Sequence, residues 1–122
     1  MYKFEAVFYE EKNKCPVEEF LKNLTEKEKI KVYKFIKLLE EKAIDMPYKY
    51  CKKFKDSKLW ELIIDYGTNT FRIFYFYHKD KIILLHAIRK KTNETPSEDK
   101  ELAEKRINMV LEVLENKGGL TK

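Results

Sequence analysis

The side chains that could do chemistry in this sequence are cations set among apolar, aromatic-rich runs, together with one carboxylate. Between Lys49 and Lys91 the chain carries eleven basic residues against four acidic ones. The surplus of positive charge in this segment therefore exceeds the net charge of the whole chain, which is +5. Such a surface suits a phosphate backbone. It also suits RNA cleavage, because the 2′-hydroxyl is the nucleophile and the protein needs only to align it, move two protons and stabilise the phosphorane.

Arg72 is the candidate for gripping the phosphate. It stands within the strand-like run Thr70–Phe76, whose other residues are mostly apolar, and a permanently charged residue is rarely present there for packing. Its guanidinium fork can hold a phosphate through two bonds, so we favour this role over a structural ion pair.

Glu61 is the candidate catalytic carboxylate. Period-two alternation places it on the same side of a strand as Asp65 and opposite Trp60. A carboxylate among lysines stays ionised and can accept the 2′ proton. An ion pair at the surface is an equal alternative.

Three cations follow the last apolar run, where the chain leaves the predicted sheet. Lys90 and Lys91 are assigned to catalysis, because they could move a proton as well as stabilise charge. Arg89 is assigned to RNA binding, with a solvated basic turn as the alternative.

Three lysines lie on either side of Phe54 and are assigned to RNA binding: Lys52, Lys53 and Lys55. We expect positive side chains from separate hairpins to converge on one hollow. Taken singly, each lysine is more often a residue that aids solubility.

His86 is the obvious acid or base of the sequence. Alternation along its strand places it on one face with Ile82, Leu84 and Ile88. On that face a hydrogen-bonded core histidine is a better interpretation than a catalyst.

Several kinds of site are missing from the sequence. It has no serine, histidine and acid arrangement, no glycine-rich phosphate loop and no cluster of carboxylates for a divalent metal, so we expect no metal and no cofactor. Cys15 and Cys51 are far apart and outside any Cys-x-x-Cys motif, which favours a reduced intracellular protein. No apolar run approaches the roughly 20 residues of a membrane span, so we expect a soluble cytoplasmic protein.

Two helices are predicted before the basic stretch and one after it. Pro16 suits the first turn of a helix, and Thr25 with Glu28 has the spacing of a capping box that starts the second. Apolar residues at spacings of three and four follow in the second helix. Thr95 with Glu98 forms another capping box, and the final helix should end at Gly118 and Gly119.

The strands are predicted from residue type and alternation. Tyr2–Tyr9 alternates as a half-buried opening strand. Runs 59–66, 70–77 and 81–88 are rich in Ile, Leu, Tyr and Phe, and the turns between them are short enough for antiparallel hairpins.

Together the elements follow the order β-α-α-β-β-β-α. The sequence therefore predicts an α+β fold with one mainly antiparallel sheet and with helices packed on a face of it. A chain of 122 residues with 43% apolar content is expected to form a single domain over residues 1–122.

Five segments in a fixed order resemble a known family. They are the lysine-bearing Lys53–Lys55, L-W-E-L at Leu59–Leu62, F-R-I-F-Y-F at Phe71–Phe76, Leu84–Pro96, and A-x-x-R at Ala103–Arg106. As a set they resemble the phage-derived Gp49-like, HigB-type branch of the RelE toxin superfamily. Relatives in the wider superfamily often place a catalytic tyrosine or histidine near the last strand, where this chain has Arg89–Lys91.

The resemblance implies a RelE-like fold and the toxin of a type II toxin-antitoxin pair. Such a toxin enters the ribosomal A site and cleaves the mRNA there without metal, and a small helix-turn-helix antitoxin neutralises it. The resemblance assigns substrate contact to Lys53 and Lys55, phosphate stabilisation to Arg72, and chemistry or binding to Lys90 and Lys91.

Two other functions remain open on the sequence. ParE-like toxins share the fold but inhibit DNA gyrase and cut no RNA. A non-catalytic RNA-binding module needs only the phosphate contacts, and it predicts salt-dependent binding without new RNA ends.

Overall fold

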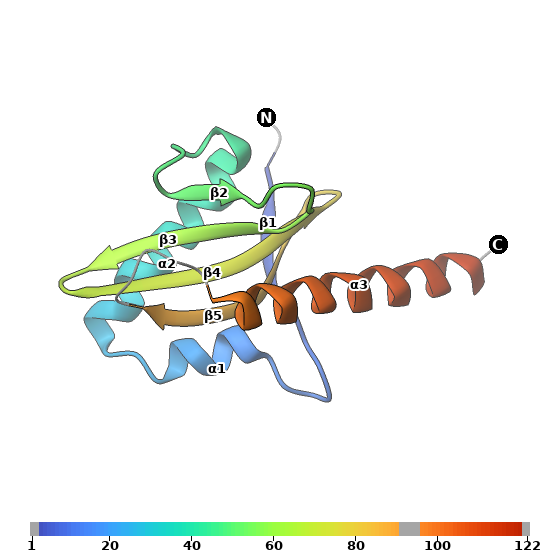
Figure 1. Cartoon of the computed structure of the whole chain (residues 1–122), viewed down its shortest axis with the longest axis horizontal. Coiled ribbons are helices and arrows are strands. Elements are labelled where there is room, and N and C mark those ends of the chain that lie inside the picture. Colours follow the sequence, from blue (N-terminus) through green and yellow to red (C-terminus); the bar gives the residue numbers. More distant parts are fainter. Residues whose placement is uncertain (1–2, 91–95, 121–122) are drawn as a thin grey trace.

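The computed structural model describes residues 3–90 and 96–120, in which five strands and three α-helices follow one another (Figure 1). The elements are β1 (Glu5–Phe8), α1 (Pro16–Lys22), α2 (Glu26–Lys42), the short 3-10 helix η1 (Ala43–Asp45), β2 (Cys51–Lys53), β3 (Trp60–Tyr66), β4 (Asn69–His78), β5 (Lys81–Lys90) and α3 (Ser97–Leu120). The three strands predicted at 59–66, 70–77 and 81–88 are confirmed within two residues at each end.

One mixed sheet joins all five strands in the order β1-β5-β4-β3-β2. Neighbours from β2 to β5 pair antiparallel, whereas β1 pairs parallel to β5 at the edge. The α+β class is confirmed, but the sheet has one strand more than predicted. Because β2 is only three residues long and two of them are exposed lysines, it carries too little alternation to be recognised.

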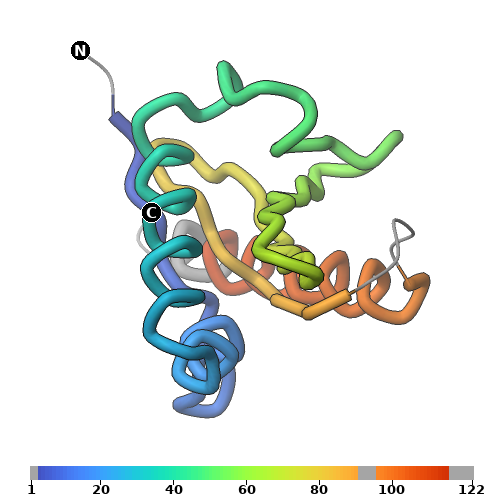
Figure 2. Tube along the Cα trace, turned by 90° about the vertical axis from the view of Figure 1, so that its left-hand side faces the viewer, coloured from blue at the N-terminus to red at the C-terminus, as the bar shows by residue number. Residues whose placement is uncertain are grey.

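Helices cover both faces of the sheet, and the prediction of helices on a face is therefore incomplete. Val17, Leu21 and Val32 of α1 and α2 pack on the face that carries Ile73, while Ala103 of α3 packs on the face that carries Phe74. We call these faces the α1/α2 side and the α3 side. In Figure 2, α2 runs down the view and α3 runs across it.

The helix ends follow the predicted signals in part. The capping box at α2 is confirmed, because Thr25 Oγ1 accepts from the Glu28 amide and Glu28 Oε1 accepts from the Thr25 amide, at 3.2 and 2.9 Å. The predicted box at Thr95 lies outside the described residues. The predicted end of α3 at Gly118 and Gly119 is wrong, since the helix continues to Leu120; glycine in a helix costs about 1 kcal/mol against alanine but still allows helical dihedrals. Among the described helices, α3 included, none combines the length and apolarity of a bilayer span.

A β-bulge interrupts the pairing of β4 with β5. Phe74 pairs with His86 but Tyr75 pairs with Leu84, so Leu85 is the extra residue on β5. Leu84 and Ala87 remain on the α1/α2 side, whereas Leu85 and His86 both face the α3 side. The bulge thus turns the imidazole of His86 away from the face that strict alternation predicts.

Candidate functional site

Strand register brings part of the predicted set together on the α3 side of the sheet. Residues that pair directly across strands share a face, about 5 Å apart, and same-face residues of one strand are about 7 Å apart. Three such rows cross the sheet: Lys52–Glu61–Phe74–His86, then Ile63–Arg72–Ile88, then Asp65–Thr70–Lys90. We call Lys52, Glu61, Arg72, His86 and Lys90 the sheet-face site.

Arg72 and Glu61 form a buried ion pair at the centre of the sheet-face site. Arg72 Nη1 donates to Glu61 Oε2 at 2.9 Å, and both side chains are 4% exposed. The ion pair that we weighed against a phosphate contact is therefore present in this structure. A phosphate that binds the guanidinium must therefore compete with the Glu61 carboxylate.

Lys52 and Lys90 lie at two margins of the sheet-face site. Lys52 is exposed on the edge strand β2, with its ammonium 5.7 Å from the centroid of the exposed Tyr48 ring. Lys90 is half-buried at the end of β5, opposite Thr70, whose hydroxyl donates to Asp65 at 2.8 Å. These lysines can approach a phosphate chain from opposite sides of Arg72.

His86 belongs to this site, contrary to its predicted place among Ile82 and Leu84. Its ring stacks on Phe74, with 5.7 Å between centroids, and its Nε2 lies 2.7 Å from Oδ1 of Asp99 in the first turn of α3. The sequence could not reveal this position, because the bulge at Leu85 reverses the alternation within an unbroken apolar run. The nearest sequence signal is Asp99 just inside the predicted start of the last helix.

Lys53 and Lys55 do not join the others as predicted. Lys53 pairs with Trp60, at the opposite end of β3 from Asp65, and it lines a separate hollow of about 300 Å³ with Lys58 and Leu111. Lys55 is exposed in the turn that follows β2. The single hollow expected for all the cations is therefore not formed by the described residues.

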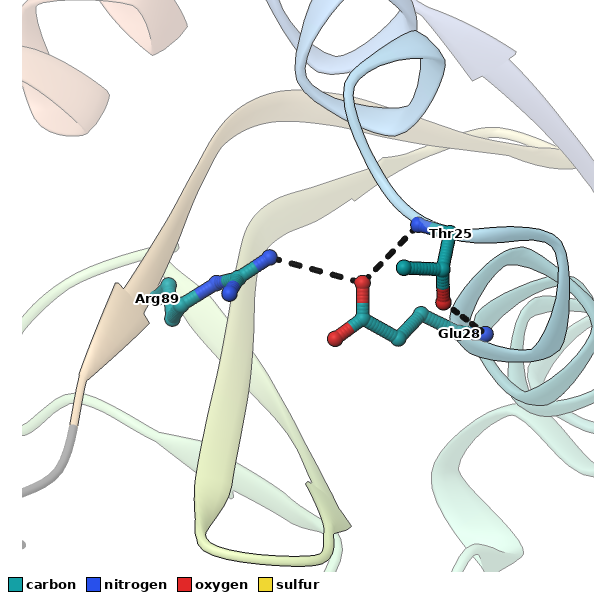
Figure 3. A network of polar contacts seen from close by, with 3 residues as sticks. All are labelled: Thr25, Glu28 and Arg89. Atoms are coloured by element: carbon teal, nitrogen blue, oxygen red, sulfur yellow. Dashed lines mark hydrogen bonds and ion pairs between the residues drawn. The ribbon is translucent and has the colours of Figure 1, made fainter.

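Arg89 points to the opposite side of the sheet. Its guanidinium lies 5.2 Å from the centroid of the Phe71 ring, and Nη2 lies 3.5 Å from Glu28 Oε1. Figure 3 shows the same Glu28 oxygen also meeting the Thr25 amide, so one carboxylate caps α2 and holds the end of β5. Arg89 thus ties two elements together on the α1/α2 side. Lys91, its neighbour in the predicted set, lies outside the described residues.

Aromatic stacking supports the floor of the sheet-face site. Phe54, which follows β2, stacks on Phe74 at 6.3 Å, and the Lys100 ammonium lies 5.4 Å from the Phe54 ring centroid. The loop after β2, the centre of β4 and the start of α3 are thereby joined. This packing gives the polar side chains a rigid base.

The charge of the sheet-face site is mixed rather than uniformly positive. The cations Lys52, Arg72 and Lys90 share the face with the carboxylates Glu61 and Asp65. Among the described residues no three His, Cys, Asp or Glu side chains are grouped so that they could hold a metal ion. The arrangement can grip an anion and offers carboxylate and imidazole groups for proton transfer.

Comparison with known families shows to which family the chain belongs. The model of the family described as phage derived protein Gp49-like (DUF891) matches residues 19–108, well over half of the chain and all of the sheet-face site. No curated protein and no solved structure matches. The chain therefore belongs to the Gp49-like family of phage-derived proteins, which is part of the RelE/HigB-like toxin superfamily of toxin-antitoxin systems.

Proposed function

We propose that the protein is a toxin that cleaves mRNA in the ribosomal A site, by attack of the 2′-hydroxyl and without a metal. The observation that carries this proposal is the register of four strands, which sets Lys52, Glu61, Arg72 and Lys90 on one face within the matched family segment. Cations from separate strands can bend an RNA backbone and stabilise its charge.

The ion pair at the centre suggests how the reaction begins. A bound phosphate takes the guanidinium of Arg72, and Glu61, released from its 2.9 Å contact, accepts the proton of the 2′-hydroxyl. The 2′-oxygen then attacks phosphorus, the bond from phosphorus to the 5′-oxygen breaks, and a 2′,3′-cyclic phosphate and a 5′-hydroxyl result. Lys52 and Lys90 hold the flanking phosphates.

The ends of the products test this reaction. Purified protein is added to translating ribosomes, new RNA ends are mapped by primer extension, and the 5′ ends are phosphorylated with a kinase. We expect 5′-hydroxyl ends, and no cut where the nucleotide before the scissile phosphate carries 2′-deoxyribose. New ends bearing 5′-phosphate would contradict attack by the 2′-hydroxyl.

Variants of the two exposed or half-buried lysines test the site itself. Lys52→Ala with Lys90→Ala should slow cutting about 10- to 100-fold, because each removes a phosphate contact, and should leave the melting temperature unchanged. Lys34→Ala, an exposed lysine of α2, is the matched control and should cut normally. Equal rates of cutting by the double variant and by Lys34→Ala would remove the sheet-face site from the mechanism.

A second candidate function is RNA binding without cleavage, and the burial of Arg72 and Glu61 favours it. Both residues are 3% exposed, and a buried pair can serve the fold rather than a substrate. This function predicts RNA binding that weakens steeply with salt while the RNA stays intact. The experiments above separate the two functions, because only cleavage produces new ends.

Membership of a toxin-antitoxin superfamily implies a cognate antitoxin. We propose that it is a small helix-turn-helix protein. Co-expression of such a protein from a neighbouring gene should relieve growth arrest and co-purify with the toxin, and failure of both would remove this assignment.

A further inference from the structure

One face of α3 holds the bulged segment of β5. Asp99 Oδ1 meets Nε2 of His86 at 2.7 Å, and Arg106 Nη1 donates to the carbonyl of Leu85, the extra residue of the bulge, at 2.8 Å. Ala103, fully buried, lies between them on the helix. Positions 99, 103 and 106 fall on one side of a helix, so a single rigid element fixes both the bulge and the ring that it turns.

The surroundings of His86 resemble those of a histidine used in proton transfer. A carboxylate bonded to one ring nitrogen orients the imidazole, while the other nitrogen is left for a substrate. Here Nε2 is engaged by Asp99, so Nδ1 is the nitrogen for the substrate. The His86 side chain is 16% exposed, so it is mostly enclosed by the protein but still reaches solvent.

His86 and Glu61 lie on opposite sides of Phe74 in the same cross-strand row, so their backbones are two strand spacings, or about 10 Å, apart. In an in-line displacement the base and the acid must stand on opposite sides of the phosphorus. Arg72 projects from the adjacent row, between the strands that carry them. A base and an acid placed in this way can approach a phosphate held by Arg72 from two sides.

We propose that His86 is the general acid of the RNA cleavage, with Asp99 and Arg106 as positioning residues. This inference rests on the proposed function. The imidazolium of His86 gives its Nδ1 proton to the departing 5′-oxygen as the bond from phosphorus to that oxygen breaks. The 2′ proton goes to Glu61, so one proton is taken and one is given. Asp99 contacts the imidazole itself, and Arg106 holds the carbonyl of Leu85, the residue before it.

A substrate whose leaving group needs no proton tests the assignment. The cut site mapped by primer extension is rebuilt in a short synthetic mRNA with sulfur in place of the bridging 5′-oxygen, and both RNAs are programmed on ribosomes. His86→Gln should cut the ordinary linkage about 100-fold or more slowly than the unmodified protein. On the sulfur-bridged linkage its rate should return to within about 10-fold, because a thiolate leaves without a proton. His78→Gln, at the last residue of β4, is the matched control and should cut both normally.

The positioning role of Asp99 has its own readout. Asp99→Asn should slow cutting of the ordinary linkage about 10-fold or more and slow cutting of the sulfur-bridged linkage much less, because a misplaced imidazole matters only where a proton must be given. A purely structural Asp99 would lower both rates equally.

Each outcome decides between the two proposals. If His86→Gln cuts the ordinary linkage at the normal rate, or is impaired equally on both linkages, His86 is not the acid and the proposed function stands. If the unmodified protein cuts neither RNA, the proposed function fails and this inference fails with it.

Discussion

Arg72 carries a permanent charge inside the sheet, where it is bonded to Glu61 at 2.9 Å. Removing two ions from water costs several kcal/mol for each, so a buried ion pair contributes little to stability and is costly to break. Well-packed apolar residues would hold the same space at least as well. We therefore expect the pair to be kept for what its two charges do rather than for the stability of the fold.

Replacing the two residues singly and together separates stability from function. Arg72→Met leaves the Glu61 carboxylate buried without its guanidinium and should lower the free energy of unfolding by about 3–5 kcal/mol. Arg72→Met combined with Glu61→Met should recover most of this loss. Urea unfolding measures both effects.

Growth arrest on induction should stay lost in the double variant, because the phosphate grip and the base are both absent. A double variant that is as stable as the original protein and still arrests growth would place Arg72 and Glu61 outside the mechanism.

At the scale of elements, helices act on the end of β5 from both sides of the sheet. On one side, α3 holds the bulge through Arg106 and the imidazole through Asp99. On the other, the first turn of α2 holds Arg89 through Glu28. A carboxylate at the N-terminus of a helix is favoured by the helix dipole, so Glu28 is well placed to serve both the helix and the strand.

Two substitutions at Glu28 distinguish its two contacts. Glu28→Gln can still accept from the Thr25 amide but loses the charge that attracts Arg89, so it should cost only about 0.5 kcal/mol. Glu28→Ala loses both contacts and should cost about 1–2 kcal/mol. The midpoint of urea unfolding measures the difference, and equal losses would show that the capping bond contributes nothing.

Local features of these elements could be predicted from the sequence, whereas relations between strands could not. Thr25 and Glu28 are three residues apart, and their capping box depends on nothing else. The side of the sheet on which His86 lies depends on the extra residue Leu85. Leu85 is extra only relative to the residues of β4 with which its neighbours pair. The contact of Arg72 with Glu61 likewise requires the register of β3 against β4. Alternation predicted the shared face of Glu61 and Asp65 correctly, because β3 contains no bulge.

At the scale of the whole molecule, the sheet lies between two apolar cores, and several ionisable groups are placed inside them. Burial raises the pKa of Tyr77 from the usual 10.0 to about 12. The pKa of Tyr9 is raised to about 12, mainly by burial and secondly by the hydrogen bond that its hydroxyl donates to Glu11. Burial also raises the pKa of Tyr75 and of the Cys51 thiol. All four groups are held in their neutral forms by the fold.

The protein should therefore lose stability in alkali. Above about pH 9 the unfolded chain begins to release protons that the folded chain still retains, so the free energy of unfolding falls as pH rises towards the folded values near 12. Melting temperatures between pH 7 and pH 11 measure this loss.

Tyr77→Phe is the matched variant for this prediction. It keeps the ring contacts with Phe4 and Trp60, at 5.3 and 5.5 Å between centroids, but removes one titrating hydroxyl. Its melting temperature should fall less steeply above pH 9 than that of the original protein. Parallel curves would show that Tyr77 ionises alike in the folded and unfolded chains.

The parallel pairing of β1 with β5 has a consequence for the order of events during synthesis. The first strand, Glu5–Phe8, finds its partner at Lys81–Leu84, about 75 residues later, so its place in the sheet cannot be taken until most of the message has been read. The last helix, which holds the imidazole in place, is made later still. We therefore expect the sheet-face site to be assembled only late in synthesis, after β5 and α3 have left the ribosome.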